Sequence, residues 1–312
     1  MDISPRLLYN VFVVIQQIDN VTYKLREKQD FSWLKQFGEV FSVVDETGSG
    51  CICFGIRKDN KDYFYKIAGA KTVESELSEL ESIELLKQSI QIYKDLNHKN
   101  LIKLVNDFEY NEFYIAVFEY AYGECLFDHW NFEKYKNDPS IITPKQRFNS
   151  LAKEKKLDVV SKLFSFFINT IDKGYLAVDF YDSSIIYDFN NDTVSFCDID
   201  LFRKAPTIND KGVDYYGTKR LKAPEENVLN AVIDERTNEL TLAAIIFDMF
   251  SNVSNTKLRK EKGMFIPNDF QEFELSKDVY DVLIKATSYN PDNRYSSIRE
   301  FKEAFDNAII NS

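Results

Sequence analysis

Short apolar runs separated by turn residues dominate the first third of the chain. Three such runs are rich in strand formers and span Glu39–Asp45, Cys51–Arg57 and Asp62–Gly69. Gly-Ser-Gly and Lys-Asp-Asn-Lys separate them, which predicts antiparallel strands joined by hairpins. The stretch 100–121 predicts two further strands that meet at the turn Asn111-Glu112.

Helical periodicity replaces alternation in most of the remaining sequence. From Val73 to Leu96 apolar residues recur every three or four positions, which predicts one long amphipathic helix. After Gly123 the pattern is mainly helical, with a strand pair expected across Asn190–Asp192. Asn238–Phe250 is apolar on every side and predicts a buried helix. Three more helices are expected over Val159–Tyr175, Lys277–Tyr289 and Ser297–Ile310.

The N-terminal region follows a helical spacing as well. Leu8, Val11, Ile15 and Ile18 share one face, which predicts an amphipathic helix over Leu7–Ile18. Together with the composition shift near Gly123, this divides the chain into three parts. They are an N-terminal helical extension (1–38), a small antiparallel β lobe with one long helix (39–122) and a larger, mainly helical lobe (123–312). The expected fold class is α+β.

Composition narrows the possible functions. The chain has 312 residues, a net charge of −11 and 44% hydrophobic residues, so it is a globular protein with ample core. The negative charge argues against partners such as nucleic acid or an anionic membrane, and the sequence lacks an apolar run of the ~20 residues that span a bilayer. Two histidines and four scattered cysteines argue against a histidine-based hydrolase or a zinc site. We therefore expect a cytoplasmic enzyme or binding protein.

Two late motifs point to a family. "GTKRLKAPEE" (217–226) is similar to the end of the activation segment of protein kinases, and Arg294 in "NPDNRYSS" matches a late arginine of the same family. With the order of expected elements, these motifs make Glu39–Ala308 resemble the protein kinase superfamily, in a divergent serine/threonine-kinase-like form of bacterial type. The resemblance implies a bilobal fold and a buried ion pair between Glu225 and Arg294. Leaving either charge unpaired would cost about 3–5 kcal/mol.

Nucleotide-binding residues follow from the same resemblance. "ETGSG" resembles the glycine-rich loop, in which Gly48, Ser49 and Gly50 would approach the phosphates of ATP, and Lys66 would bind the phosphates from the third strand. "AVFEYAYGE" resembles the hinge. There Phe118 would lie beside the adenine, the backbones of Glu119 and Ala121 would bind its edge, and Glu124 would reach the ribose. The usual helix glutamate has no clear counterpart, since the expected position holds Ser89, with Glu84 and Glu81 one and two turns earlier.

The catalytic residues are matched in two short segments. "AVDFYDSS" aligns with the catalytic loop, which makes Asp179 the residue that orients the substrate hydroxyl and accepts its proton, with Thr218 beside it. "CDIDLF" resembles the magnesium-binding Asp-Phe-Gly motif and makes Asp198 a Mg²⁺ ligand, with Ser184 or Asp182 as a second oxygen donor. The sequence departs from the family at several positions: Ala177, Val178, Tyr181 and Ser184 replace histidine, arginine, lysine and asparagine, Asp200 replaces glycine, and Asn238 replaces a buried aspartate.

Three functions fit this pattern. The first is an ATP- and Mg²⁺-dependent kinase that phosphorylates a serine or threonine of a protein substrate. The second is a pseudokinase, in which the same fold acts as a nucleotide-binding or interaction module. The third is a small-molecule kinase of the aminoglycoside or choline type, against which Gly217–Glu225 argues because that class lacks this segment.

Overall fold

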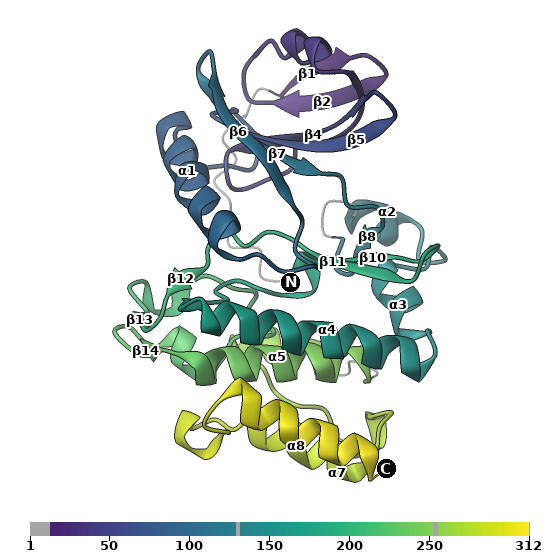
Figure 1. The fold of residues 1–312 in the computed structure, drawn as a ribbon, viewed down its shortest axis with the longest axis vertical. Helices are drawn as coiled ribbons and strands as arrows, with labels where there is room; N and C mark the ends of the chain where they lie inside the picture. The colour runs from purple at the N-terminus through teal and green to yellow at the C-terminus, as the bar shows by residue number, and fades with distance from the viewer. Residues whose placement is uncertain (1–12, 129–131, 252–254, 312) are drawn as a thin grey trace. The chain divides into compact units, whose positions relative to one another are not determined.

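The computed structural model describes residues 13–128, 132–251 and 255–311. The chain divides into two compact units. The N-terminal unit comprises Met1–Lys94 and Ile102–Ala121, and the C-terminal unit comprises Asp95–Leu101 and Tyr122–Ser312. In Figure 1 the first unit is coloured purple to blue, and the second runs from teal to yellow.

A five-stranded antiparallel sheet forms the centre of the N-terminal unit. The strand order is β3-β4-β5-β7-β6. The strands span Glu39–Val44 (β3), Cys51–Lys58 (β4), Lys61–Ala68 (β5), Leu104–Tyr110 (β6) and Phe113–Glu119 (β7). Residues opposite one another in neighbouring strands share a face, so Ile52, Ile67 and Ile115 lie side by side on the face that forms the core.

A β-hairpin, not a helix, precedes this sheet. Val14–Ile18 (β1) pairs with Val21–Leu25 (β2), so the helix expected over Leu7–Ile18 is wrong for residues 14–18. Residues 7–12 of that helix lie outside the described residues. Ile18 also fits the inward face of a strand. The apolar run before the Asp19-Asn20 turn is too short to distinguish helical spacing from strand alternation. The hairpin packs into the core of the sheet through Tyr23 and Leu25.

One long helix completes the N-terminal unit. Helix α1 spans Glu79–Asp95 and begins six residues later than its periodicity predicts. Ser78 explains the start, because its hydroxyl accepts from the backbone N–H of Glu81 (3.3 Å) while the Glu81 carboxylate accepts from the backbone N–H of Ser78 (2.8 Å). This reciprocal capping box satisfies N–H groups that the first turn leaves free.

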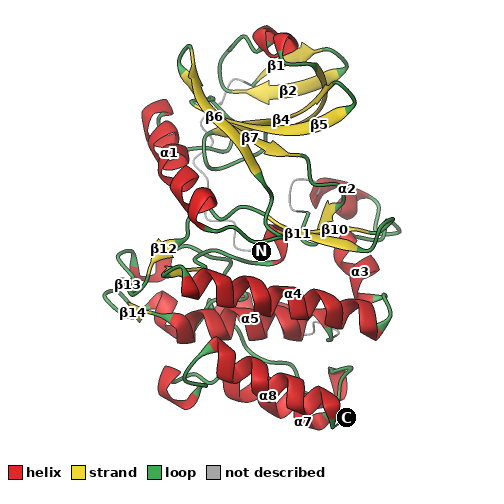
Figure 2. Ribbon diagram, in the orientation of Figure 1, coloured by secondary structure: helices red, strands yellow, loops and turns green. Residues whose placement is uncertain are grey.

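Helices dominate the C-terminal unit (Figure 2). Its helices span Phe132–Asn137 (α2), Pro144–Asn149 (α3), Lys153–Asp172 (α4), Glu235–Met249 (α5), Thr256–Lys262 (α6), Lys277–Ala286 (α7) and Ile298–Ile310 (α8). Helix α5 packs against α4, α7 and α8, and its residues from Thr237 to Met249 are all buried. This central position explains why its sequence has no polar face.

Short strands connect these helices. They span Glu124–Cys125 (β8), Tyr175–Leu176 (β9), Ile185–Asp188 (β10), Thr193–Phe196 (β11), Arg203–Lys204 (β12), Thr207–Ile208 (β13) and Val232–Ile233 (β14). The predicted strand pair is the antiparallel hairpin β10–β11. An antiparallel sheet in the N-terminal unit and helices in the C-terminal unit confirm the expected α+β class, consistent with a bilobal kinase-like fold. Among the described residues, no helix is long and apolar enough to cross a membrane.

Candidate active site

The hairpin β10–β11 places two of the predicted carboxylates near one another. Asp179 precedes β10 by way of the 3₁₀ helix Asp182–Ser184, and Asp198 follows β11. Beyond the last strand pair, Ile185–Phe196, the backbone N–H of Cys197 donates to the carbonyl of Ser184 (3.0 Å). The segments that carry the two aspartates therefore leave the hairpin at the same end.

Both aspartates have an unusual backbone conformation. Asp179 has φ of 62° and Asp198 has φ of 55°, in the left-handed region that most L-residues avoid. Asparagine and aspartate tolerate this region better than other side chains. Such conformations persist where the surrounding structure holds them, and they are concentrated at functional sites.

The charge of Asp198 affects the pKa of Asp179. The pKa of Asp179 is raised to about 7, mainly by burial and then by the negative charge of Asp198, while the ammonium of Lys222 acts in the opposite direction. Tyr181 belongs to the same cluster, because burial and then the charges of Asp179 and Asp198 raise its pKa. A phenol here replaces the lysine that the family pattern has at this position.

The donor set is suitable for a magnesium ion. The Ser184 hydroxyl is fully buried, and among the described residues its oxygen has no hydrogen-bond partner. Burying such a group without a partner costs free energy, so the hydroxyl oxygen of Ser184 is a candidate donor to a ligand. No group of three or more His, Cys, Asp or Glu side chains in the described chain could hold a metal. Mg²⁺ characteristically needs only one or two carboxylates, with phosphate and water completing its shell.

Lys222 is a member of this cluster that the sequence analysis missed. Its ammonium is buried and donates to the carbonyls of Val213 (3.3 Å) and Tyr215. Burial lowers its pKa, while the charges of Glu226 and Asp179 act in the opposite direction. Lys222 thus places a positive charge within electrostatic range of Asp179, in a stretch where the family pattern has an apolar residue.

The buried ion pair expected between Glu225 and Arg294 is confirmed. The two guanidinium nitrogens of Arg294 donate to the two carboxylate oxygens of Glu225 at 2.7 and 2.9 Å. Thr237 donates a further hydrogen bond to Glu225 (2.8 Å), and Arg294 also donates to the carbonyls of Ser288 and Arg236 at 2.9 Å each. The pair anchors the end of the segment 217–226 to the helical part of the unit.

Asn238 fixes the start of the loop that carries Asp179. Its side-chain oxygen accepts from the backbone N–H of Ala177 (2.7 Å), and its amide donates to the carbonyl of the same residue (3.2 Å). Both residues are 2% exposed, so water does not replace these bonds easily. The asparagine can satisfy both backbone groups, whereas an ionised aspartate could only accept.

Replacing Asn238 by alanine should therefore destabilise the protein. We expect a loss of about 1–3 kcal/mol in the free energy of unfolding, because two buried backbone groups lose their partner. Urea denaturation measures this loss. The matched control is Asn307→Ala on the exposed side of α8, which should change the free energy by less than about 0.5 kcal/mol. Equal stability of Asn238→Ala and the wild type would contradict this prediction.

Lys66 lies in the N-terminal unit, at the middle of the central strand β5. It is opposite Cys53 of β4 and Ala116 of β7, on the sheet face away from the core residues Tyr65 and Ile67. Phe118 is on the same face and is fully buried, with its ring 4.8 Å from that of Tyr93 in α1. The lysine is thus on a central strand and not on an exposed edge.

The glycine-rich loop connects β3 to β4. Gly50 has φ of 69°, and a Cβ atom there would lie 2.8 Å from the Cβ of Ser82 in α1. Position 50 therefore requires glycine, because the loop packs closely on the helix. Gly48 is different, because a Cβ atom there would meet nothing within 4 Å. Ser49, between them, is half-buried.

The remaining candidates are spread over the hinge, α1 and the activation segment. Glu119 is exposed and forms an ion pair with Lys103 (2.6 Å). Ala121 is the last residue of the N-terminal unit, and Glu124 pairs with Arg147 in the C-terminal unit.

In α1, Glu81 and Glu84 are exposed, and the buried Ser89 donates to the carbonyl of Leu86. Thr218 is half-buried, and its carbonyl accepts from the backbone N–H of Leu221 (2.9 Å).

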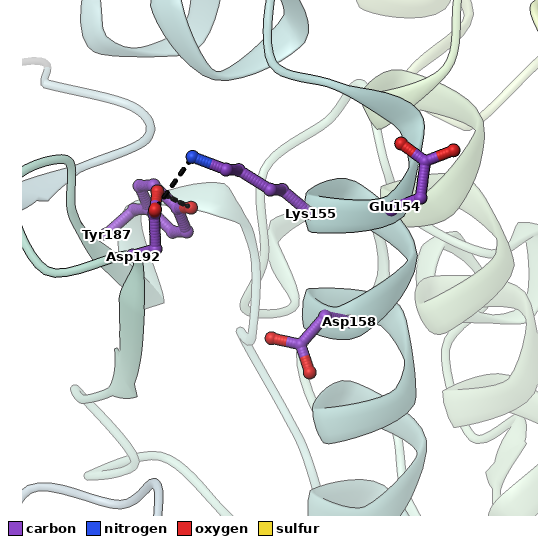
Figure 3. Close-up of a pocket in the computed structure, with 5 residues that line it drawn as sticks. All are labelled: Glu154, Lys155, Asp158, Tyr187 and Asp192. Carbon is purple, nitrogen blue, oxygen red and sulfur yellow. Dashed lines mark hydrogen bonds and ion pairs between the residues drawn. The ribbon is translucent and has the colours of Figure 1, made fainter.

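A hollow of about 250 Å³ lies elsewhere in the C-terminal unit. Its lining residues are Glu154, Lys155 and Asp158 of α4 with Tyr187 and Asp192 of the hairpin (Figure 3). Lys155 and Tyr187 both donate to the Asp192 carboxylate, at 2.7 and 3.0 Å, so three of the lining side chains pair with one another. Asp192 is at the turn of the hairpin and Asp198 follows its open end. The hollow is therefore separate from the candidate active site.

Two known protein kinases are similar in sequence to this chain. The chain is 25% identical over 224 residues to calcium-dependent protein kinase 5 of Plasmodium falciparum, which covers 69% of this chain. It is 23% identical over 220 residues to the protein of the same name from Plasmodium berghei, which covers 68% of this chain. The chain is a distant relative of protein kinases. No family model matches its sequence. The alignments extend over only 36% of each of these relatives.

Proposed function

We propose that this protein kinase relative transfers the γ-phosphoryl group of ATP to a serine or threonine hydroxyl of a protein, with Mg²⁺ as cofactor. The observation that carries the proposal is the coupling of Asp179, whose pKa is raised to about 7, with Asp198 at one end of the β10–β11 hairpin. A group that ionises near neutral pH can accept a proton at physiological pH. The bacterial type expected from the sequence stays a prediction.

In this proposal each candidate residue has a defined task. Asp179 orients the substrate hydroxyl and takes its proton, with Thr218 beside the hydroxyl. Asp198 and Ser184 would hold Mg²⁺, which would neutralise phosphate charge when bound. Lys66 and the backbone of Gly48–Gly50 bind the phosphates. Phe118, Glu119, Ala121 and Glu124 would contact the adenine and ribose.

Calorimetric titration with Mg-ATP tests the nucleotide part of the proposal. We expect the wild type to bind, and Lys66→Ala and Asp198→Ala to bind at least about tenfold more weakly, because each loses a charge-assisted contact. Lys61→Ala on the exposed end of β5 and Asp192→Ala at the hairpin turn serve as matched controls and should bind like the wild type. Absence of binding by the folded wild type would contradict the proposal.

Transfer of radiolabelled phosphate separates the remaining functions. Labelling of the chain itself or of a generic protein substrate by the wild type supports the proposal. The pseudokinase alternative is favoured by Tyr181, which replaces a cationic side chain with a phenol beside two carboxylates. Binding of Mg-ATP without transfer would support that module. Labelling of free amino alcohols but of no protein would support a small-molecule kinase instead.

A further inference from the structure

A chain of buried charges connects the catalytic loop to the activation segment. Asp182 is three residues after Asp179, and Arg220 is two residues after Thr218. Arg220 donates one guanidinium nitrogen to Asp182 and the other to Asp248 of α5, the latter at 2.8 Å. Arg220 is 8% exposed and the two aspartates are 2% exposed each, so the contacts are out of the solvent.

A second arginine closes the network behind Asp248. Arg259 of α6 is fully buried and donates to the other carboxylate oxygen of Asp248 (2.7 Å). Its remaining nitrogens donate to the side chain of Asn268 (3.1 Å) and to the carbonyl of Ile266 (2.6 Å). Two arginines thus balance two aspartates, with Lys145 at 3.5 Å from the second oxygen of Asp182. Buried charges are tolerated when they are paired and hydrogen-bonded in this way.

Arg220 is the member of this network that connects the activation segment to the other elements. Asp248, near the end of α5, pairs with Arg259 of α6, while Asp182 belongs to the 3₁₀ helix after Asp179. Only Arg220 comes from the segment 217–226. A planar guanidinium that bonds two carboxylates in fixed directions restrains both position and orientation, which a single flexible ammonium does less well.

We infer that Arg220 is a positioning residue that holds the segment carrying Thr218 against the loop carrying Asp179. The inference deepens the proposed function and rests on it. The restraint comes from the chain's own arginine and two aspartates.

Hydrogen exchange on the full chain tests the restraint without any need for catalysis. Arg220→Gln should accelerate exchange of the amides in 212–222 and 179–184 by roughly tenfold or more, because the segment opens locally, and leave the peptide around Lys66 unchanged. Arg220→Lys, which keeps a cation, should restore part of the protection. Arg299→Gln removes an arginine from an exposed pair with Asp172 and should leave both segments as in the wild type.

Kinetics then separate positioning from general stabilisation. We expect Arg220→Gln to lower kcat roughly ten- to a hundredfold with the KM for ATP within about twofold of the wild type, since misplaced groups slow the chemical step. A folded Arg220→Gln protein with wild-type exchange in 212–222 would overturn the inference, whatever its activity. If that variant does not fold, Asp182→Asn with Arg220→Lys probes the same contact. A wild type that transfers no phosphate while exchange still responds to Arg220→Gln would remove the proposed function and support the restraint alone.

Discussion

Replacing Asp179 by asparagine is expected to lower the rate of phosphoryl transfer by a factor of about 10²–10⁴, the usual contribution of a positioned general base. The amide keeps the size of the side chain and loses only the ability to accept the hydroxyl proton. Initial rates with radiolabelled ATP measure the loss. Asp192→Asn, at the exposed turn of the β10–β11 hairpin, is the matched control and should retain wild-type activity. A variant Asp179→Asn that transfers phosphate at the wild-type rate would exclude Asp179 as the base.

The pH profile of the wild type follows from the same carboxyl group. A base must be ionised, and the pKa of Asp179 is raised to about 7 by burial and by Asp198. We therefore expect kcat/KM of the free enzyme to increase tenfold per pH unit below about pH 7 and to level off above it. Asp198→Asn removes a neighbouring negative charge, so the remaining transfer should reach its plateau at a lower pH.

Asp179 should also make the protein less stable at high pH. Its pKa is higher in the folded state than the unfolded value of 3.8, so the folded state binds the proton more tightly. Its contribution to stability is complete below about pH 4 and is lost as the pH rises through about 7. Asp179→Asn should consequently be more stable than the wild type by roughly 2–4 kcal/mol at pH 8, and this difference should disappear near pH 4. Urea denaturation at the two pH values measures it.

Local sequence signals were sufficient to predict most of the fold. The strands β4 and β5 and the buried helix α5 were predicted because alternating or uninterrupted apolar residues reflect burial directly. The first strand, β1, was predicted as a helix. Its residues fit the spacing of a helix as well as the alternation of a strand. The strand forms because β1 pairs with β2 across a turn of only two residues.

The site was harder to predict, because its chemistry depends on residues from distant parts of the sequence. Family motifs located Asp179 and Asp198, yet they did not indicate Lys222 or Arg220 as part of a buried charge cluster. The sequence does contain one signal of this cluster. Asp248 is the only charged residue in the stretch "LTLAAIIFDMF", and a carboxylate inside a buried helix requires a cationic partner. The two partners of Asp248, Arg220 and Arg259, can be identified only from the fold.

Breaking the ion pair between Glu225 and Arg294 is expected to have the largest effect on stability. Glu225→Gln or Arg294→Gln should lower the free energy of unfolding by about 3–5 kcal/mol, because each leaves a buried charge without its partner. The double variant should cost less than the sum of the two single variants, since it leaves neither charge unpaired. Denaturant titration of the wild type, the two single variants and the double variant completes this double-mutant cycle.

The matched control for this cycle is the pair between Arg299 and Asp172. Its geometry also includes two short contacts, at 2.6 Å each, but its side chains are 61% and 51% exposed. Water can solvate either charge after its partner is removed, so Arg299→Gln should cost no more than about 1 kcal/mol. A cost for Glu225→Gln as small as that of Arg299→Gln would mean that the pair does not anchor the segment 217–226. In that case the buried surroundings of Arg294, with backbone carbonyl partners at Ser288, Arg236 and Tyr289, would have to stabilise this charge without the carboxylate.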